Sequence, residues 1–356
     1  MEEIHLNVPL LRRRVPNLTV AARAVGLRSA TVSDLTTGKI PLGKATVRTL
    51  VALADLAGCT LDELVIRGGA VEMIETGIRV LDTFAPMVRG GTVGLVARQG
   101  SGQTVVLQEL VRRFRQKGFA TMAWLNGEAH PLMKEVAGET EASACRMSEL
   151  QALIEAQLAQ RDVLVAADRS VVLTGELETL RERVAQAGLH RVSFALVDVS
   201  GDSPDEDAPF GPLDTLWRFD VELAARRIFP AVDPVLSTST LLEGAQLDPA
   251  HLLVQQRARK LFRRYQELKA LARAVGEEKI PAAEVRTYYR GQRLEMFMSQ
   301  HLYVAEPYTK QPGQWISLAE ALDDIRRILD GAADEIALED LRSVGRLPDT
   351  RFAGRD

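Results

Sequence analysis

Four runs of apolar residues, separated by helical stretches, constrain the fold of this chain most strongly. The helical stretches between them read VVLQELVRRFRQ, MSELQALIEAQLAQ and LETLRERVAQAG. Continuous apolar strands that alternate with helices indicate a parallel sheet covered on both faces, so the sequence predicts an α/β core. The apolar runs cover residues 92–97, 119–125, 162–167 and 192–198.

The stretch ARQGSGQT, residues 97–104, ends the first apolar run and begins the first of these helices. In a phosphate-binding loop, backbone N–H groups and a helix N-terminus surround the phosphates, a Lys bridges the β and γ phosphates, and a Ser or Thr hydroxyl holds Mg²⁺. Gly100, Gly102 and Thr104 keep the loop and the hydroxyl. Gln103 stands where the Lys is expected, and Ala97 stands where the first Gly is expected.

Residues 8–66 have the pattern of short helices with polar starts. Thr19, Ser29 and Thr46 are the candidate N-caps, and Gly26 and Gly38 are the candidate stops. Residues 1–50 contain eight Lys or Arg against three Asp or Glu, although the whole chain has a net charge of -4. A basic end on an acidic protein indicates an anionic partner for this segment.

Within this segment, AARAVGLRSATVSDLTTGK followed by TVRTLVALADLAGCTLDELV resembles the helix-turn-helix domain of phage repressors and Cro. We expect Ala22 at the helix crossing, and Val32 and Leu35 buried on the second helix. The resemblance implies DNA binding, while a small helical bundle for protein contacts is the alternative. The residues expected to face DNA bases or phosphates are Arg28, Ser29, Thr31, Ser33, Lys39 and Lys44.

From residue 75 to about residue 345 the chain resembles the catalytic beta subunit of the rotary ATP synthase. The resemblance rests on ETGIRVLDTFAPMVRGGTVGLVARQGSGQTVVLQEL, on FPAVDPVLSTST, and on RYQELKALARAVGEE through RLEMFMSQHLYVAEPYTKQPGQWISLAEAL. It implies a RecA-like parallel-sheet core at 68–235 and a helical C-terminal domain at 236–345, followed by a tail at 346–356. The family's N-terminal β-barrel is replaced by the helix-turn-helix domain, residues 1–67.

The same resemblance assigns roles around the loop. Asp198 matches the carboxylate that holds the Mg²⁺ water shell, and Glu128 matches the carboxylate that orients the attacking water. Phe229, Leu302 and Tyr308 fall where the family stacks aromatic rings on the adenine. The resemblance therefore implies ATP or ADP with Mg²⁺ as the ligand, with Thr104 and Asp198 at the metal. The alternative is that Phe229 and Tyr308 are core residues inherited with the fold.

Four positions that meet phosphate charge in the family have lost their cation in this chain, namely Gln103, Ala129, Asp202 and Thr240. Losing one charge-assisted hydrogen bond costs about 1.5–3 kcal/mol of binding. An arginine finger, by contrast, contributes about 10³–10⁵ in rate. The sequence therefore predicts that nucleotide binding persists and that efficient hydrolysis does not. Arg98 is a candidate replacement for the missing Lys, with an ordinary solvated Arg as the alternative.

These features predict a DNA-binding, ring- or filament-forming regulator or DNA-organising protein with a degenerate nucleotide site. The resemblance implies self-association into a homo-oligomer, with a hexamer as one form. The alternatives are an active DNA-associated ATPase and a purely structural scaffold. We expect a cytoplasmic protein without a membrane partner, because no run of eighteen apolar residues occurs and Cys59 and Cys145 have neither metal-site nor disulfide spacing.

Overall fold

The computed structural model separates the chain into two compact units. Unit 1 contains Met1–Met73 with Ser239–Pro249, and unit 2 contains Ile74–Thr238 with Ala250–Asp356. The nucleotide-binding core and the C-terminal helices, predicted as separate domains, lie together in unit 2. The structure describes residues 4–15, 18–37, 39–67, 72–127, 129–158, 161–188, 191–201, 210–211, 213–242 and 247–347.

Unit 1 is mainly helical, as predicted, but it also contains a two-stranded antiparallel ribbon in which Ile4 pairs with Arg67. This ribbon was not predicted, because each of its strands has only three residues. Its core includes Val32 and Leu35, which were predicted to be buried, and Ala22, which was predicted to lie at the helix crossing. The elements are β1 (Ile4–Leu6), α1 (Val8–Arg14), α2 (Leu18–Ala24), α3 (Ser29–Thr36), η1 (Leu42–Lys44), α4 (Val47–Ala57), α5 (Leu61–Leu64) and β2 (Val65–Arg67).

The predicted parallel sheet is confirmed and forms the centre of unit 2. The seven strands have the order β11-β10-β5-β9-β8-β6-β7, and the six strands from β10 to β7 are parallel to their neighbours. The four predicted runs agree with β5, β6, β8 and β9 to within a residue at each end. The strands are β5 (Thr92–Val96), β6 (Ala120–Trp124), β7 (Ala142–Ala144), β8 (Val163–Asp168), β9 (Val192–Val197), β10 (Thr215–Arg218) and β11 (Thr238–Ser239).

Helices cover both faces of this sheet, which explains why its central strands are apolar without interruption. Leu164 and Ala166 of β8 belong to the cluster that includes α7 and α8, whereas Val163 and Val165 belong to the cluster that includes α9 and α11. Successive side chains of a strand therefore enter opposite cores. The helices are α7 (Gln103–Gln116), α8 (Pro131–Glu139), α9 (Met147–Leu158), α10 (Ser170–Leu173) and α11 (Glu176–Gln186).

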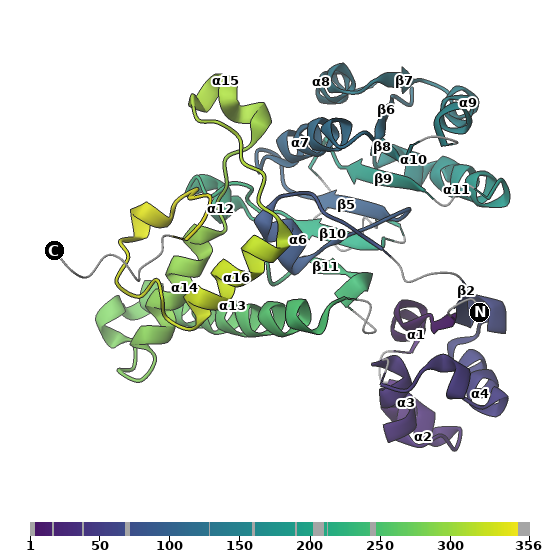
Figure 1. Ribbon diagram of the computed structural model, residues 1–356, viewed down its shortest axis with the longest axis horizontal. Helices are drawn as coiled ribbons and strands as arrows, with labels where there is room; N and C mark the ends of the chain where they lie inside the picture. The colour runs from purple at the N-terminus through teal and green to yellow at the C-terminus, as the bar shows by residue number, and fades with distance from the viewer. Residues whose placement is uncertain are drawn as a thin grey trace. The chain divides into compact units, whose positions relative to one another are not determined.

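The C-terminal helices share a core with the α7 face of the sheet. Figure 1 shows the long α13 with α14 and α16 nearby. The buried side chains of α13 include Val254, Ala258, Tyr265 and Leu268, which form an apolar stripe along the helix. The remaining elements are β3 (Met73–Ile74), α6 (Arg79–Phe84), β4 (Met87–Val88), α12 (Val221–Ala225), η2 (Thr240–Leu242), α13 (Pro249–Val275), η3 (Glu277–Lys279), α14 (Val285–Phe297), η4 (Tyr303–Ala305), α15 (Glu306–Thr309), α16 (Leu318–Leu329) and η5 (Leu338–Leu341).

Candidate functional site

The loop between β5 and α7 has the backbone geometry that a phosphate site needs. Gly100 has φ 85° and Gly102 has φ 89°, a left-handed conformation that L side chains rarely adopt. Gly102 is the N-cap of the 14-residue helix α7 and has no side chain to cap it. The first N–H groups of α7 therefore remain available to an anion. In the same loop, the Oγ atom of Ser101 is buried and has no hydrogen-bond partner among the described residues.

A cavity of about 720 Å³ opens beside this helix N-terminus. We call it the Phe229 cavity, because Phe229 lines it together with Gly102 and Leu302. The Phe229 ring is close to the loop, since a Cβ on Gly102 would lie 3.8 Å from it. The structure thus brings one predicted loop residue and two predicted base-pocket residues into one cavity. Tyr308, the third predicted base-pocket residue, does not line this cavity and is 87% exposed.

The other predicted loop residues lie in different surroundings. Gln103 is buried and Thr104 is half-buried in the first turn of α7. Arg98 is exposed and lines a separate cavity of about 230 Å³ together with Arg218 and Asp233, rather than the Phe229 cavity. The structure therefore does not bring Arg98 into the space expected for phosphates. Glu128 and Asp202 lie outside the described residues.

Two strands, not one, end in an aspartate at the loop edge of the sheet. Asp198 follows β9, and its Oδ1 accepts hydrogen bonds from Ser200 Oγ at 2.7 Å and Gly201 N at 3.2 Å. Asp168 is the last residue of β8, and its Oδ1 accepts from Ser170 N at 2.9 Å. Sequence reasoning selected Asp198 and missed Asp168, although DVLVAAD is also an apolar run that ends in Asp.

The loop after β9 packs directly against the loop between β5 and α7. A Cβ on Gly201, which has φ 75°, would lie 2.5 Å from Gln99 N, so only Gly fits there. Arg169, which follows Asp168, places Nη1 3.7 Å from Asp198 Oδ2. Arg169, which was not predicted as a site residue, therefore lies near both strand-end carboxylates, Asp168 and Asp198.

Three arginines also line the Phe229 cavity, and sequence reasoning missed all of them. Arg226 and Arg227 follow α12, and Arg342 follows η5. The sequence offered one signal for them, because Arg226 and Arg227 are adjacent and only Ile228 separates this pair from Phe229. No Asp or Glu is among the described residues that line this cavity.

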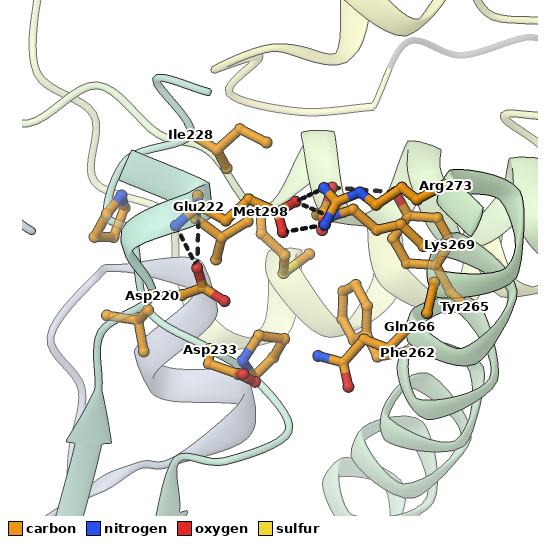
Figure 2. A pocket seen from close by; sticks show the side chains of 16 residues that line it. Asp220, Glu222, Ile228, Asp233, Phe262, Tyr265, Gln266, Lys269, Arg273 and Met298 are labelled. Atoms are coloured by element: carbon orange, nitrogen blue, oxygen red, sulfur yellow. Dashed lines mark hydrogen bonds and ion pairs between the residues drawn. The ribbon is translucent and has the colours of Figure 1, made fainter. Parts of the chain in front are cut away.

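A network of ion pairs fixes α12, which directly precedes Arg226 and Arg227, and Figure 2 shows Glu222, Lys269 and Arg273 of this network. Glu222 of α12 binds Lys269 and Arg273 of α13, and Glu295 of α14 binds Arg226 and Lys269. The hydrogen bond from Arg273 is the main cause that lowers the pKa of Glu222 to about 2. A smaller cavity of about 170 Å³ is lined by Glu222, Glu295, Lys269 and Arg273, but their charges are already paired. We therefore interpret the network as an anchor for α12 rather than as a binding site.

In unit 1, α2 and α3 are joined by a turn at Gly26, which has φ 77° as predicted for this stop. The capping predictions had mixed outcomes. Thr46 caps α4 by accepting from Thr49 N at 3.2 Å. Ser29 does not cap α3, because it is the first helical residue and its Oγ accepts from Arg23 Nε at 2.6 Å. Thr19 lies inside α2, and Gly38 lies outside the described residues.

The side chains predicted to contact DNA all retain some exposure. Those of Arg28, Ser33, Lys39 and Lys44 are exposed, while Ser29 and Thr31 are half-buried. In the described part of the chain, no three His, Cys, Asp or Glu side chains are grouped as ligands for a metal ion. None of the described helices combines the length and the apolar character needed to cross a membrane.

Comparison with known proteins identifies the type of core. Residues 77–172 match the ATP synthase alpha/beta family, nucleotide-binding domain. A solved structure, a unique ATP synthase subunit NeqB from Nanoarcheaum equitans, has a TM-score of 0.58 and 16% sequence identity, over 74% of this chain and 77% of that chain. At this identity the likeness concerns the fold. These comparisons confirm the coarser part of the predicted resemblance, an ATP synthase-like nucleotide-binding domain, while the likeness to the catalytic beta subunit and the helix-turn-helix domain stay predictions.

Proposed function

We propose that this protein binds an adenine nucleotide in the Phe229 cavity and hydrolyses it slowly or not at all. The observation that carries the proposal is the cavity itself, which is lined by Gly102 at the N-terminus of α7 and by the aromatic ring of Phe229. The phosphates would accept from the free N–H groups of α7, and the base would pack on Phe229 and Leu302. Nucleotide pockets of this kind combine an apolar lining with a few polar groups.

Mg²⁺ would bind in this site together with the phosphates of the nucleotide. Mg²⁺ usually binds through one or two carboxylates, waters and substrate phosphates, so it needs no cage of three protein ligands. The Thr104 hydroxyl and a strand-end carboxylate are the groups that would hold it. Asp198 is our sequence-based choice, and Asp168 on the adjacent strand is the second candidate. The metal would neutralise charge on the phosphates.

Weak hydrolysis follows from the missing cations, because the cavity itself is present. Gln103 cannot supply the positive charge of a Lys, and Ala129 and Thr240 supply no guanidinium. Backbone N–H groups retain affinity for the ground state, but they do not replace the charges that stabilise the transition state. The site is therefore suited to sensing a nucleotide or to stabilising an assembly.

Titration of a fluorescent ATP analogue with Mg²⁺ should show saturable binding, while phosphate release measured in the same samples stays at the level of buffer. Binding should compete with unlabelled ADP, because both ligands use the same cavity. A protein that binds no analogue would contradict the nucleotide proposal. Phosphate release that depends on Mg²⁺ would instead favour the active DNA-associated ATPase.

For unit 1 we propose a helix-turn-helix that binds DNA with modest sequence specificity. Arg28 and Ser33 of the α3 region and Lys39 and Lys44 beyond it provide exposed groups for phosphates and base edges. One such domain binds weakly, so we propose a homo-oligomer, with a ring or filament as its form, that presents several domains at once. The protein would then act in the cytoplasm as a transcription regulator or as a DNA-organising factor.

The double variant Arg28→Ala/Lys39→Ala should bind duplex DNA more weakly than the unmodified protein in mobility shifts at low salt. Each lost phosphate contact should lower the slope of log affinity against log salt by about 1. The matched control is Lys260→Ala/Arg263→Ala, which removes two exposed cations of α13 and should leave DNA affinity unchanged. If the unmodified protein binds no DNA at low salt, unit 1 is better explained as a protein-contact module in a scaffold.

A further inference from the structure

The positively charged side chains that line the Phe229 cavity do not come from the loop between β5 and α7. Gln103 contributes no charge at the loop, whereas Arg226, Arg227 and Arg342 line the cavity from other segments. The described lining residues include no carboxylate, and the partners of Arg226 and Arg342, Glu295 and Glu339, lie outside the lining. A ligand with all its phosphates at α7 would leave the guanidinium of Arg227 facing its uncharged parts, and desolvating a cation without a counter-charge is costly.

Of the three guanidinium groups, that of Arg227 is the least compensated. Arg226 forms an ion pair with Glu295, and Arg342 Nε lies 3.3 Å from Glu339 Oε2. For the exposed side chain of Arg227, the described part of the chain provides neither a hydrogen-bond acceptor nor an ion-pair partner. Its charge therefore remains available to an anion in the cavity.

The backbone holds Arg227 in an unusual conformation. Its φ is 57°, in the left-handed region that favours Gly. Arg227 N donates to Ala224 O at 2.9 Å, and Arg342 Nη1 donates to Arg227 O at 3.1 Å. Non-Gly residues in such conformations are costly and concentrate at functional sites. A large charged side chain at a position suited to Gly indicates that the guanidinium itself has a role.

We infer that the Phe229 cavity takes a nucleotide with a second phosphate on its ribose, at the 2′ or 3′ oxygen. The 5′-phosphate lies at the N-terminus of α7, and the ribose phosphate accepts hydrogen bonds from Arg227, with Arg342 beside it. Arginine suits this task because its guanidinium presents several donors to phosphate oxygens. The inference rests on the proposed nucleotide binding and adds the ligand class to it.

Isomeric ligands test this inference, because ADP and the adenosine 2′,5′- and 3′,5′-bisphosphates differ only in the position of the second phosphate. Calorimetric titrations in one Mg²⁺ buffer should give at least one bisphosphate about tenfold tighter binding than AMP, and tighter binding than ADP. Equal affinity for AMP and both bisphosphates would overturn the inference but keep nucleotide binding. No binding of any of the four ligands would overturn both.

Arg227→Gly tests the role of the guanidinium without straining the backbone. Gly adopts φ 57° readily, so the thermal midpoint should not fall, and the preference for the bisphosphate over AMP should disappear. Arg263→Ala, an exposed arginine on α13 outside the cavity, should keep that preference. If Arg227→Gly keeps the preference as well, the assignment of Arg227 is wrong.

Discussion

Replacing Glu109 by Gln should lower the free energy of unfolding of unit 2 by about 3–5 kcal/mol, the usual cost of removing one partner from a buried ion pair. Glu109 and Arg113 form a pair of fully buried side chains in α7, with 2.6 Å between Oε1 and Nε. Glu109 also accepts from Tyr303 N at 3.0 Å and Val304 N at 2.9 Å. A Gln side chain would turn an amide N–H₂ toward one of these donors and leave the Arg113 charge without its partner.

Tryptophan fluorescence during urea unfolding measures this effect selectively, because Trp124, Trp217 and Trp315 all belong to unit 2. The matched control is Glu149→Gln, which removes the exposed partner of Arg146 and should leave the unfolding midpoint unchanged. A change below about 1 kcal/mol for Glu109→Gln would show that the buried pair is not what fixes α7 to the C-terminal segment.

The same pair explains why two predicted domains form one unit. Arg113 donates to Gly77 O at 2.8 Å and to Gln314 O at 2.7 Å, so α7 is bound to chain segments that lie far before and far after it. A charged residue at the end of an amphipathic helix looks solvated in the sequence, and nothing local reveals that it is buried. The predicted boundary between the core and the C-terminal domain at residue 235 rests on the resemblance alone.

The strands, in contrast, were predictable because burial on both faces leaves a local signature. Every residue of β5, β6 and β9 is buried, and such runs are difficult to mistake. The short β7 and β10 were missed because they carry three and four residues and mix buried with exposed positions. Of the two, β7 lies at the edge of the sheet, where a strand needs no continuous apolar run.

The candidate site was only partly predictable, for reasons of spatial arrangement. Gly100 and Gly102 were recognisable because their positive φ requires Gly, a constraint that is local to the loop. Asp168 was missed because β9, which is later in the sequence, lies between β5 and β8 in the sheet. Arg342 was missed because its place in the Phe229 cavity depends on packing across more than a hundred residues.

Restoring the loop lysine with Gln103→Lys should tighten binding of the ATP analogue with Mg²⁺ about 10- to 100-fold. Gln103 is the first residue of α7 and directly follows Gly102, which lines the Phe229 cavity. A Lys there adds one charge-assisted hydrogen bond to phosphate, worth about 1.5–3 kcal/mol, and 1.4 kcal/mol is a factor of ten in affinity. Phosphate release should stay near background, because Ala129 and Thr240 still provide no arginine for the transition state.

Gln99→Lys is the control for this variant, because it adds the same charge to an exposed position of the same loop. The new charge at this position would attract the phosphates only from a distance, and solvent ions screen an exposed charge. Gln99→Lys should therefore tighten binding only slightly. Equal gains for the two variants would mean that net charge, rather than a contact at the α7 N-terminus, controls affinity. Absence of a gain for Gln103→Lys would place the phosphates elsewhere in the Phe229 cavity, next to its arginines.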